Sequence, residues 1–286
     1  MLQAARDAGY KNVSKRLLID WTELGLLDTP ERTGRGPGGG SGSRFEFPDA
    51  QRELFLSILQ HRGGLKHVAG LASLPVSAWL YWGDEWVPLR QVRKALMTWW
   101  GRGGHLQSLR KTRDLAERFV DVLVADQASK AKRKRLVDEI TSSMDSQHYD
   151  VAKITPLVED VLASLPGGHW GPFQMGTQEA VDLLRAMSVA IEHYDEFSDG
   201  AFYEARARIR QNALAYFRDQ PQMTEHRVWG HWFNEMSFQD LINRACADLL
   251  ISLGFMRIAI DYGRTLPTIE LQRWTRPPEE LLRRIT

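Results

Sequence analysis

Apolar residues recur along most of this chain at intervals of three and four, the spacing of helices with one buried face. The pattern predicts a short helix over residues 2–8, a second over 14–25 and a third that begins at Pro48. Residues 44–47, just before that proline, have the alternation of a short strand. Because no sustained alternation follows, the expected fold is mainly α. Further helices are expected at 65–71, 76–82, 88–100, 106–125, 136–144, 154–165, 178–194, 200–217, 238–260 and 277–285.

The helix over residues 14–25 has clear signals at both ends. Ser14 offers a hydroxyl that can cap the first turn, and Gly25 can adopt the left-handed conformation that stops a helix. A short turn joins it to the preceding helix. Two helices joined in this way form a helix-turn-helix, whose second helix inserts its N-terminal residues into the major groove of DNA. Lys15 and Arg16 occupy that first turn.

The side chains of this turn suit a nucleic-acid surface. An arginine can donate two hydrogen bonds to O6 and N7 of guanine, which is worth about 1–3 kcal/mol of base discrimination. Arg16 is therefore the candidate for base contact, and the Ser14 hydroxyl with the free amides of the helix N-terminus suits a phosphate. Asp20 and Glu23 lie farther along, where we expect them to leave the groove. The same pattern also fits an amphipathic core helix whose basic residues are in solvent.

Residues 28–43 contain six glycines and two prolines. Glycine loses the most entropy on ordering and proline lacks a backbone donor, so we expect a loop without helix or interior strand. The run does not end in Gly-Lys-Ser/Thr and no strand is predicted before it, which argues against a phosphate-binding nucleotide loop. Arg32 and Arg35 within the run, and Arg44 after it, suit a wing that lies along the DNA backbone.

Three motifs follow one another in this region: Val13-Ser14-x-Arg16-x-Leu18, then Gly25-Leu26-Leu27-x-x-Pro30-x-Arg32, then Arg44-Phe45 ahead of a helix. Over about residues 1–62 they resemble the DNA-binding domain of the MerR family. The resemblance implies a winged helix-turn-helix in which Ser14 and Arg16 contact the groove and the three arginines of the wing contact the backbone. It also places Trp21 at a position that is usually aromatic.

The resemblance extends to assembly, and the chain departs from it in two places. Members of the family are usually dimers held by a long helix after the DNA-binding domain, and they often bend or untwist promoter DNA. The helix expected over residues 106–125 stands in that place, although packing within one chain explains its apolar face equally well. Ile19-Asp20-Trp21 replaces the family's usual Arg-Tyr-Tyr, which removes one basic contact and one tyrosine, and the wing is longer and richer in glycine.

The length of 286 residues predicts two or three units with separate cores. We expect a DNA-binding domain over 1–62, a tryptophan-rich helical unit with a basic face over 63–135, and an all-α C-terminal domain over 136–286. The net charge is only +1, but residues 90–135 hold thirteen Lys and Arg against four Asp and Glu, whereas 138–200 hold two against twelve. This asymmetry has two explanations. Either the basic part of the chain is the part that binds an anion, or basic and acidic residues simply lie on different solvent-exposed helical faces. The additional candidates for phosphate contact are Arg90, Arg93, Lys94, Lys132 and Arg133.

Two groups of large apolar residues can each be interpreted as a helical core or as a binding surface. A group of tryptophans fits a small helical core or a platform that stacks on unpaired bases; its members are Trp79, Trp82, Trp86, Trp99 and Trp100. A later group fits a helical core or a pocket for a small-molecule effector; its members are Trp229, Trp232, Phe233, Met236, Phe255 and Met256. The single cysteine, Cys246, excludes an intramolecular disulfide and a Cys-based zinc site, and its apolar neighbours favour a buried thiol over a redox sensor.

No metal, cofactor or catalytic site is predicted. His231 and Glu235 are one turn apart with His226 nearby, and residues 192–196 add further ligand types. Neither segment supplies a Glu-x-x-His pair, and no His-Glu-x-x-His or Gly-x-Ser-x-Gly motif occurs. The N-terminus lacks the pattern of a signal peptide and no apolar run reaches membrane-spanning length, so a cytoplasmic protein is expected.

These features predict a transcriptional regulator that binds a specific double-stranded DNA site through the helix over 14–25 and the wing. A homodimer is expected, with an effector of unknown kind at the C-terminal helices. The first alternative is an architectural or excisionase-like recombination accessory factor, which would bind clustered sites at an attachment region and bend them. The second is a helical protein–protein adaptor whose acidic C-terminal half binds a partner. An enzyme is the class that fits the motifs least.

Overall fold

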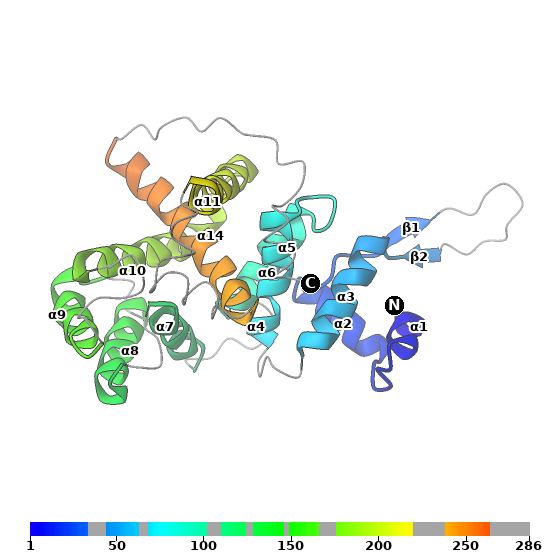
Figure 1. The fold of residues 1–286 in the computed structure, drawn as a ribbon, viewed down its shortest axis with the longest axis horizontal. Coiled ribbons are helices and arrows are strands. Elements are labelled where there is room, and N and C mark those ends of the chain that lie inside the picture. Colours follow the sequence, from blue (N-terminus) through cyan, green and yellow to red (C-terminus); the bar gives the residue numbers. More distant parts are fainter. Residues whose placement is uncertain are drawn as a thin grey trace, which may run out of the picture. The chain divides into compact units, whose positions relative to one another are not determined.

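The structure is a computed structural model that describes residues 1–33, 44–62, 68–101, 110–123, 128–145, 149–165, 176–219 and 238–263. The described residues are mainly helical, as the sequence predicts (Figure 1). The chain divides into two compact units, Met1–Gln107 and Ser108–Thr286. The helix expected over residues 277–285 lies outside the described residues. No helix in the described part of the chain combines the length and the apolar content that crossing a membrane requires.

The described part of the first unit contains helices and one two-stranded antiparallel sheet, in which Thr33 pairs with Arg44. Figure 1 shows the two strands leading away from the neighbouring helices. The three N-terminal helices and the second strand occur where the sequence predicts them. In chain order the elements are α1 (Leu2–Asp7), α2 (Lys15–Glu23), β1 (Glu31–Thr33), β2 (Arg44–Glu46), α3 (Asp49–His61), α4 (Val68–Leu71), α5 (Ser73–Tyr81) and α6 (Leu89–Trp99). The predicted buried face of α3 is confirmed, with Leu54, Phe55, Ile58 and Leu59.

The sequence predicts a loop over residues 28–43, but the first part of this run forms β1. Glu31–Thr33 contains neither glycine nor proline and precedes the first glycine of the run. Among the described residues β1 pairs only with β2, so it is an edge strand rather than the interior strand that glycine and proline disfavour. The prediction treats residues 28–43 as one run rich in glycine and proline. The three residues of β1 within it therefore do not stand out as a strand.

The described part of the second unit is helical. Its elements are α7 (Arg110–Leu123), α8 (Lys130–Asp145), α9 (Val151–Leu162), α10 (Thr177–Glu192), η1 (Tyr194–Glu196), α11 (Asp199–Asp219) and α14 (Phe238–Asp261). α8 begins at Lys130, before the predicted start at Leu136, because Lys, Ala and Arg are strong helix formers although they add nothing to the apolar pattern. α9 also begins early, at Val151, where the Asp150 carboxylate accepts hydrogen bonds from the first turn.

The two units differ from the three domains expected from the sequence. The expected boundary after residue 62 lies within the first unit, and the one after residue 135 lies inside α8. α7 packs against α8 and α14. Among the α7 residues whose side chains are described, the buried apolar ones are Leu115, Ala116, Phe119 and Val120. The apolar face of α7 is therefore covered within a single chain, because the helices that follow it supply the neighbouring surface.

Opposite charges pair across the helices of the second unit. Arg113 of α7 donates a hydrogen bond to Asp138 of α8, with 2.6 Å between nitrogen and oxygen. Lys132 and Arg135 of α8 lie 3.7 and 3.6 Å from carboxylate oxygens of Asp160 in α9. Each contact joins the basic block of the sequence to the acidic block. Part of the charge asymmetry along the chain is therefore charge pairing in space, an explanation that the sequence pattern does not reveal.

α10 and α14 pack with their backbones in close contact at one point. A Cβ added to Gly254 of α14 would lie 1.8 Å from the carbonyl oxygen of Ala186 in α10. Fully buried side chains of both helices contribute to the same core, and they include Leu184, Met187, Leu250 and Leu253. Glycine is required at residue 254 because any side chain there would separate the two helices.

The first prediction is that Gly254→Ala destabilises the second unit. Helix propensity alone favours alanine by about 1 kcal/mol. The added methyl group must displace the backbone of α10, however, and overpacking of this kind costs about 1–3 kcal/mol, occasionally more. Urea unfolding followed by circular dichroism should therefore show a lower midpoint for this variant.

Gly200→Ala is the matched control, because the Cβ added near the start of α11 meets the Ser198 hydroxyl at an ordinary 3.6 Å. It should leave stability unchanged or raise it slightly, since alanine is the better helix former. Equal unfolding midpoints for the two alanine variants would contradict the close packing of α10 and α14.

Candidate nucleic-acid interface

The first turn of α2 is capped and exposed. The Ser14 hydroxyl accepts a hydrogen bond from the Leu17 amide at 3.2 Å, which confirms the predicted N-cap. Ser14, Lys15 and Arg16 all have exposed side chains. The first amides of a helix have no partner within it, so this turn presents donors and two cations to solvent together. These are the groups that a phosphate or a base edge can use.

On the opposite side of α2, Trp21 is buried against α3, and Leu17 and Leu18 are half-buried. Trp21 packs edge-on against Phe55, with 5.8 Å between the ring centroids and 67° between the planes. Such an aromatic pair contributes about 0.5–1.5 kcal/mol beyond the area that it buries. The pair fixes the rotation of α2 about its axis. Lys15 and Arg16 face outward as a result.

α2 ends in a backbone arrangement that requires glycine. The Leu26 amide donates to the Trp21 carbonyl at 2.8 Å, and the Gly25 amide donates to the Thr22 carbonyl at 3.2 Å, which together form a Schellman motif. Gly25 has a φ of 71°, and a Cβ there would lie 2.4 Å from the backbone nitrogen of Ala95 in α6. Gly25 is therefore needed both for the predicted helix stop and for the approach of α6.

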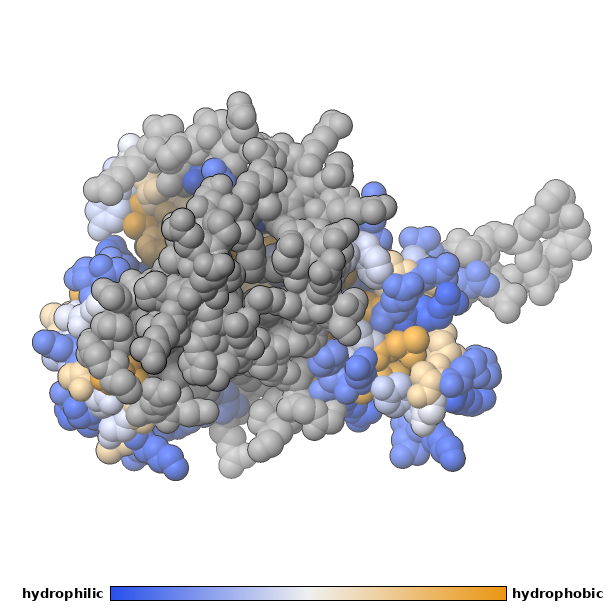
Figure 2. Space-filling model, viewed as in Figure 1, coloured by the Kyte–Doolittle hydropathy of each residue, from blue (hydrophilic) through white to orange (hydrophobic). Residues whose placement is uncertain are grey.

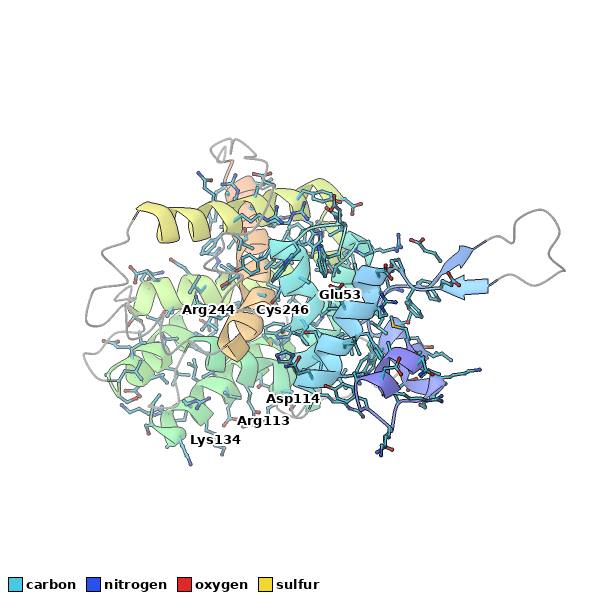
Figure 3. The ribbon with its side chains drawn as sticks, turned by 45° about the vertical axis from the view of Figure 1, so that its right-hand side comes forward. Glu53, Arg113, Asp114, Lys134, Arg244 and Cys246 are labelled. Carbon is cyan, nitrogen blue, oxygen red and sulfur yellow. The ribbon has the colours of Figure 1, made fainter. Side chains whose placement is uncertain are left out.

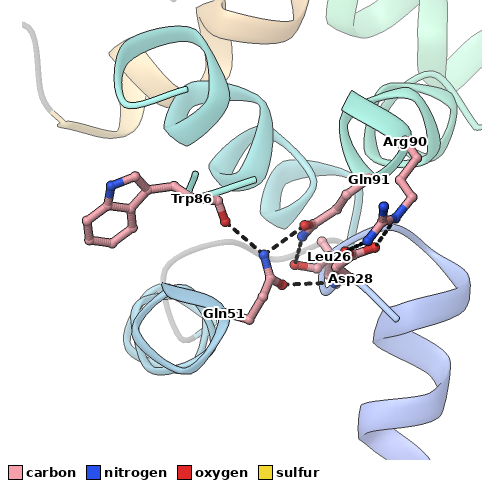
Figure 4. A network of polar contacts seen from close by, with 6 residues as sticks. All are labelled: Leu26, Asp28, Gln51, Trp86, Arg90 and Gln91. Carbon is pink, nitrogen blue, oxygen red and sulfur yellow. Dashed lines mark hydrogen bonds and ion pairs between the residues drawn. The ribbon is translucent and has the colours of Figure 1, made fainter. Parts of the chain in front are cut away.

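Two buried glutamines join the end of α2 to α3 and α6 (Figure 4). The Gln51 side-chain oxygen in α3 accepts a hydrogen bond from the Asp28 amide at 2.8 Å. The Gln51 side-chain nitrogen donates to the Trp86 carbonyl and to Gln91 Oε1, both at 2.9 Å. Gln91 in α6 donates in turn to the Leu26 carbonyl at 3.0 Å. The two glutamines are 2% and 1% exposed, so an interrupted network would leave buried polar groups unsatisfied.

Arg90 of α6 forms a two-point contact with Asp28. Its Nε donates to Oδ1 at 3.0 Å, and its terminal nitrogen donates to Oδ2 (Figure 4). The hydrogen bond to Asp28 raises the pKa of Arg90 above its ordinary value. The Asp28 side chain is 11% exposed and that of Arg90 64%. Arg90, a predicted phosphate contact, therefore neutralises a largely buried carboxylate in the same unit.

Arg16 also has an acidic neighbour, but a weakly held one. Its Nε lies 2.8 Å from Asp20 Oδ1 one turn along α2, and the Arg16 side chain is 76% exposed. Exposed pairs at this spacing contribute about 0.3–0.5 kcal/mol. Two hydrogen bonds to guanine are worth about 1–3 kcal/mol of discrimination. Arg16 can therefore exchange Asp20 for a base at low cost.

The arginines of the predicted wing are described to different extents. In the backbone register, Arg32 of β1 lies opposite Phe45, and Arg44 of β2 lies opposite Thr33. Arg35 lies outside the described residues, as do the side chains of Arg32 and Arg44.

On the face seen in Figure 2, hydrophilic residues predominate at the right, where Figure 1 places α1, α2 and the strands.

The remaining candidates for phosphate contact lie in both units. Lys94 of α6 is exposed. Arg93 in the same helix and Arg133 in α8 are partly buried, and each takes part in an interaction within the chain. Lys132 donates to the Asp160 carbonyl at 2.9 Å. Sequence spacing does not reveal these contacts, because the partners come from other helices.

The clustered tryptophans differ in burial, since Trp82 and Trp86 are half-buried and the other three are buried. Trp79, Trp99 and Trp100 are buried, which confirms the core interpretation for these three. The thiol of Cys246 is also buried, on α14 (Figure 3), as expected.

Of the residues predicted to line an effector pocket, Met256 is buried whereas Phe255 is exposed. The other four, Trp229, Trp232, Phe233 and Met236, lie outside the described residues.

The acidic segment after α10 forms ion pairs. His193 Nδ1 lies 2.8 Å from one Glu196 oxygen, and Arg257 of α14 donates to the other at 2.7 Å. The hydrogen bond from His193 and, to a smaller extent, the one from Arg257 hold the pKa of Glu196 below its ordinary value.

Within the described residues, no group of three or more His, Cys, Asp or Glu side chains is placed to hold a metal ion. His226, His231 and Glu235 lie outside them.

The structure brings Ser14, Lys15 and Arg16 together on one exposed turn. It adds Ile19, which is 51% exposed on the same helix and is not a candidate from the sequence. The helical spacing already places Ile19 opposite the apolar stripe of α2, but an isolated isoleucine has none of the polar chemistry by which binding residues are sought in a sequence. Comparison of the chain with protein-family models, with curated proteins and with solved structures finds no match.

The second prediction concerns the glutamine network. Gln51→Leu keeps the volume but leaves the Asp28 amide and the Trp86 carbonyl without this partner, which should cost about 1–3 kcal/mol. Thermal and urea unfolding should both report the loss. Gln60→Leu, on the exposed side of the same helix, is the control and should change stability little. A Gln51→Leu protein as stable as the Gln60→Leu protein would show that the network contributes nothing.

The third prediction concerns pH. The pKa of Glu196 is lowered on folding from its ordinary value of 4.5, so its ion pairs stabilise the protein above that pH. The stabilisation is lost as the pH falls through the folded-state pKa. The difference in unfolding free energy between the wild type and Glu196→Gln should therefore shrink on acidification. Glu192→Gln removes a charge from an exposed position of α10 and serves as control. A difference that grows in acid would contradict the assignment.

Proposed function

We propose that the first unit is a winged helix-turn-helix similar to that of the MerR family, and that the protein is a transcriptional regulator of a specific DNA site. α2 is the recognition helix, and the β1–β2 hairpin is the wing. One observation carries the proposal: the capped first turn of α2 exposes Ser14, Lys15 and Arg16 together, while Trp21 on the opposite side is buried against Phe55 of α3. The order of α1, α2, the hairpin and α3 supports it.

Each part of the unit has a separate task in this mechanism. Arg16 leaves Asp20 and donates to a guanine in the major groove. The Ser14 hydroxyl and the N-terminal amides of α2 hold a phosphate, and the wing arginines contact the backbone beside the groove. The network around Gln51 and Gln91 keeps the far end of α2 in place, so the recognition helix enters the groove at a defined angle.

A homodimer would match a site with two half-sites about 34–36 Å apart, one turn of DNA. Because α7 already packs its apolar face within one chain, the contact between two copies would use another surface. The spacing of the half-sites in a selected sequence measures the geometry of such a dimer. A selected sequence with one half-site would favour a monomer.

The fourth prediction is tested by selection of bound sequences from random duplex DNA with the full chain. Arg16→Ala should remove the preference at one position, an effect of about 5- to 150-fold. Arg35→Ala and Arg44→Ala should weaken binding to all sequences alike and reduce the slope of log affinity against log salt by about one.

Two variants sharpen this experiment. Arg52→Ala removes an exposed arginine of α3, which lies 3.0 Å from Asp49, and should leave the preference unchanged. Asp20→Asn removes an acidic group beside the base-reading arginine and should tighten binding. If Arg16→Ala retains the selected site and its affinity, α2 does not read the groove. Clustered sites away from promoters would favour a recombination factor, and no enrichment would favour an adaptor.

A further inference from the structure

Ile19 is an apolar side chain on an otherwise charged face. It is 51% exposed and lies one turn after Lys15 and three residues after Arg16, on the same side of α2. In the described part of the first unit, the exposed large apolar side chains are Ile19 and Val68, which starts α4. Of these two, only Ile19 lies on the helix that carries the capped basic turn.

The surroundings of Ile19 fit a base edge better than a protein surface. Protein docking sites usually present contiguous apolar patches of several hundred Å². Ile19 is instead a single apolar group among charged neighbours, namely Lys15, Arg16, Asp20 and Glu23. In the major groove, thymine presents a methyl group, and an isolated apolar side chain can contact it.

We propose that Ile19 selects for a thymine through contact with its 5-methyl group, an inference that rests on the proposed function. Residues three apart on a helix are separated by about 4.5 Å along its axis, and successive bases of a DNA strand by about 3.4 Å. The thymine therefore lies within one or two base pairs of the guanine that Arg16 reads. Ile19 is therefore a specificity-determining residue of this chain.

The test replaces each thymine of the selected duplex, one at a time, with deoxyuridine, which lacks only the 5-methyl group. Binding of the full chain is measured by fluorescence anisotropy at one salt concentration. One replacement near the guanine should weaken binding about fourfold, the loss expected for one buried methyl group. The other replacements should have smaller effects.

Variants assign the effect to Ile19. Ile19→Ala should bind the thymine and deoxyuridine duplexes equally, and Ile19→Val should retain part of the difference. Val68→Ala, which removes the other exposed apolar group, should retain all of it. Because Ile19 is exposed and alanine is the better helix former, Ile19→Ala should fold normally, and circular dichroism checks this.

The outcomes separate this inference from the proposed function. If the selected duplex tolerates deoxyuridine at every thymine, Ile19 does not read a methyl group, although DNA binding stands. If Ile19→Ala keeps the fourfold difference, another residue reads it and the inference is again overturned. If selection enriches no sequence, the proposed function fails first.

Discussion

The first unit depends on a small set of buried hydrogen bonds where α2, α3 and α6 meet. Gln51 and Gln91 satisfy backbone groups of the segment after α2 and of the turn before α6. The approach is possible because Gly25 has no side chain in the way of α6. Such a network is stabilising only when all of its members are satisfied, since a single unpaired buried group costs more than a hydrogen bond contributes. The position of α2 therefore depends on three uncharged residues distant from its exposed turn.

Charge has two different roles in this protein. Arg90 pairs with a largely buried carboxylate, and its loss would leave Asp28 uncompensated. Lys132 and Arg135 in the second unit pair with Asp160, but its side chain is 46% exposed, so these pairs are weaker. Arg16 has a carboxylate partner at a comparable distance, but both groups are exposed, so the pair is weak and exchangeable. The burial of the carboxylate therefore distinguishes Arg90 from Arg16, since the Asp28 side chain is 11% exposed and that of Asp20 39%.

The same distinction applies to apolar residues. Trp21 and Ile19 both come from the segment that departs from the MerR pattern, and they lie two residues apart. Trp21 is buried against Phe55 and fixes α2, whereas Ile19 is exposed beside the basic turn. Burial therefore separates the apolar residue that holds α2 in place from the one that solvent reaches.

Local sequence determined the start and stop of α2, the buried face of α3 and the mainly helical fold, because each depends on residues within a few positions of one another. The Ser14 cap and the Gly25 stop are of this kind. The tertiary structure alone decided which arginines are engaged, where the chain divides and why residue 254 is glycine. Asp28 and Arg90 are 62 residues apart, and Gly254 meets a helix that begins at Thr177. No periodicity encodes such pairings, since they arise only when separate helices pack together.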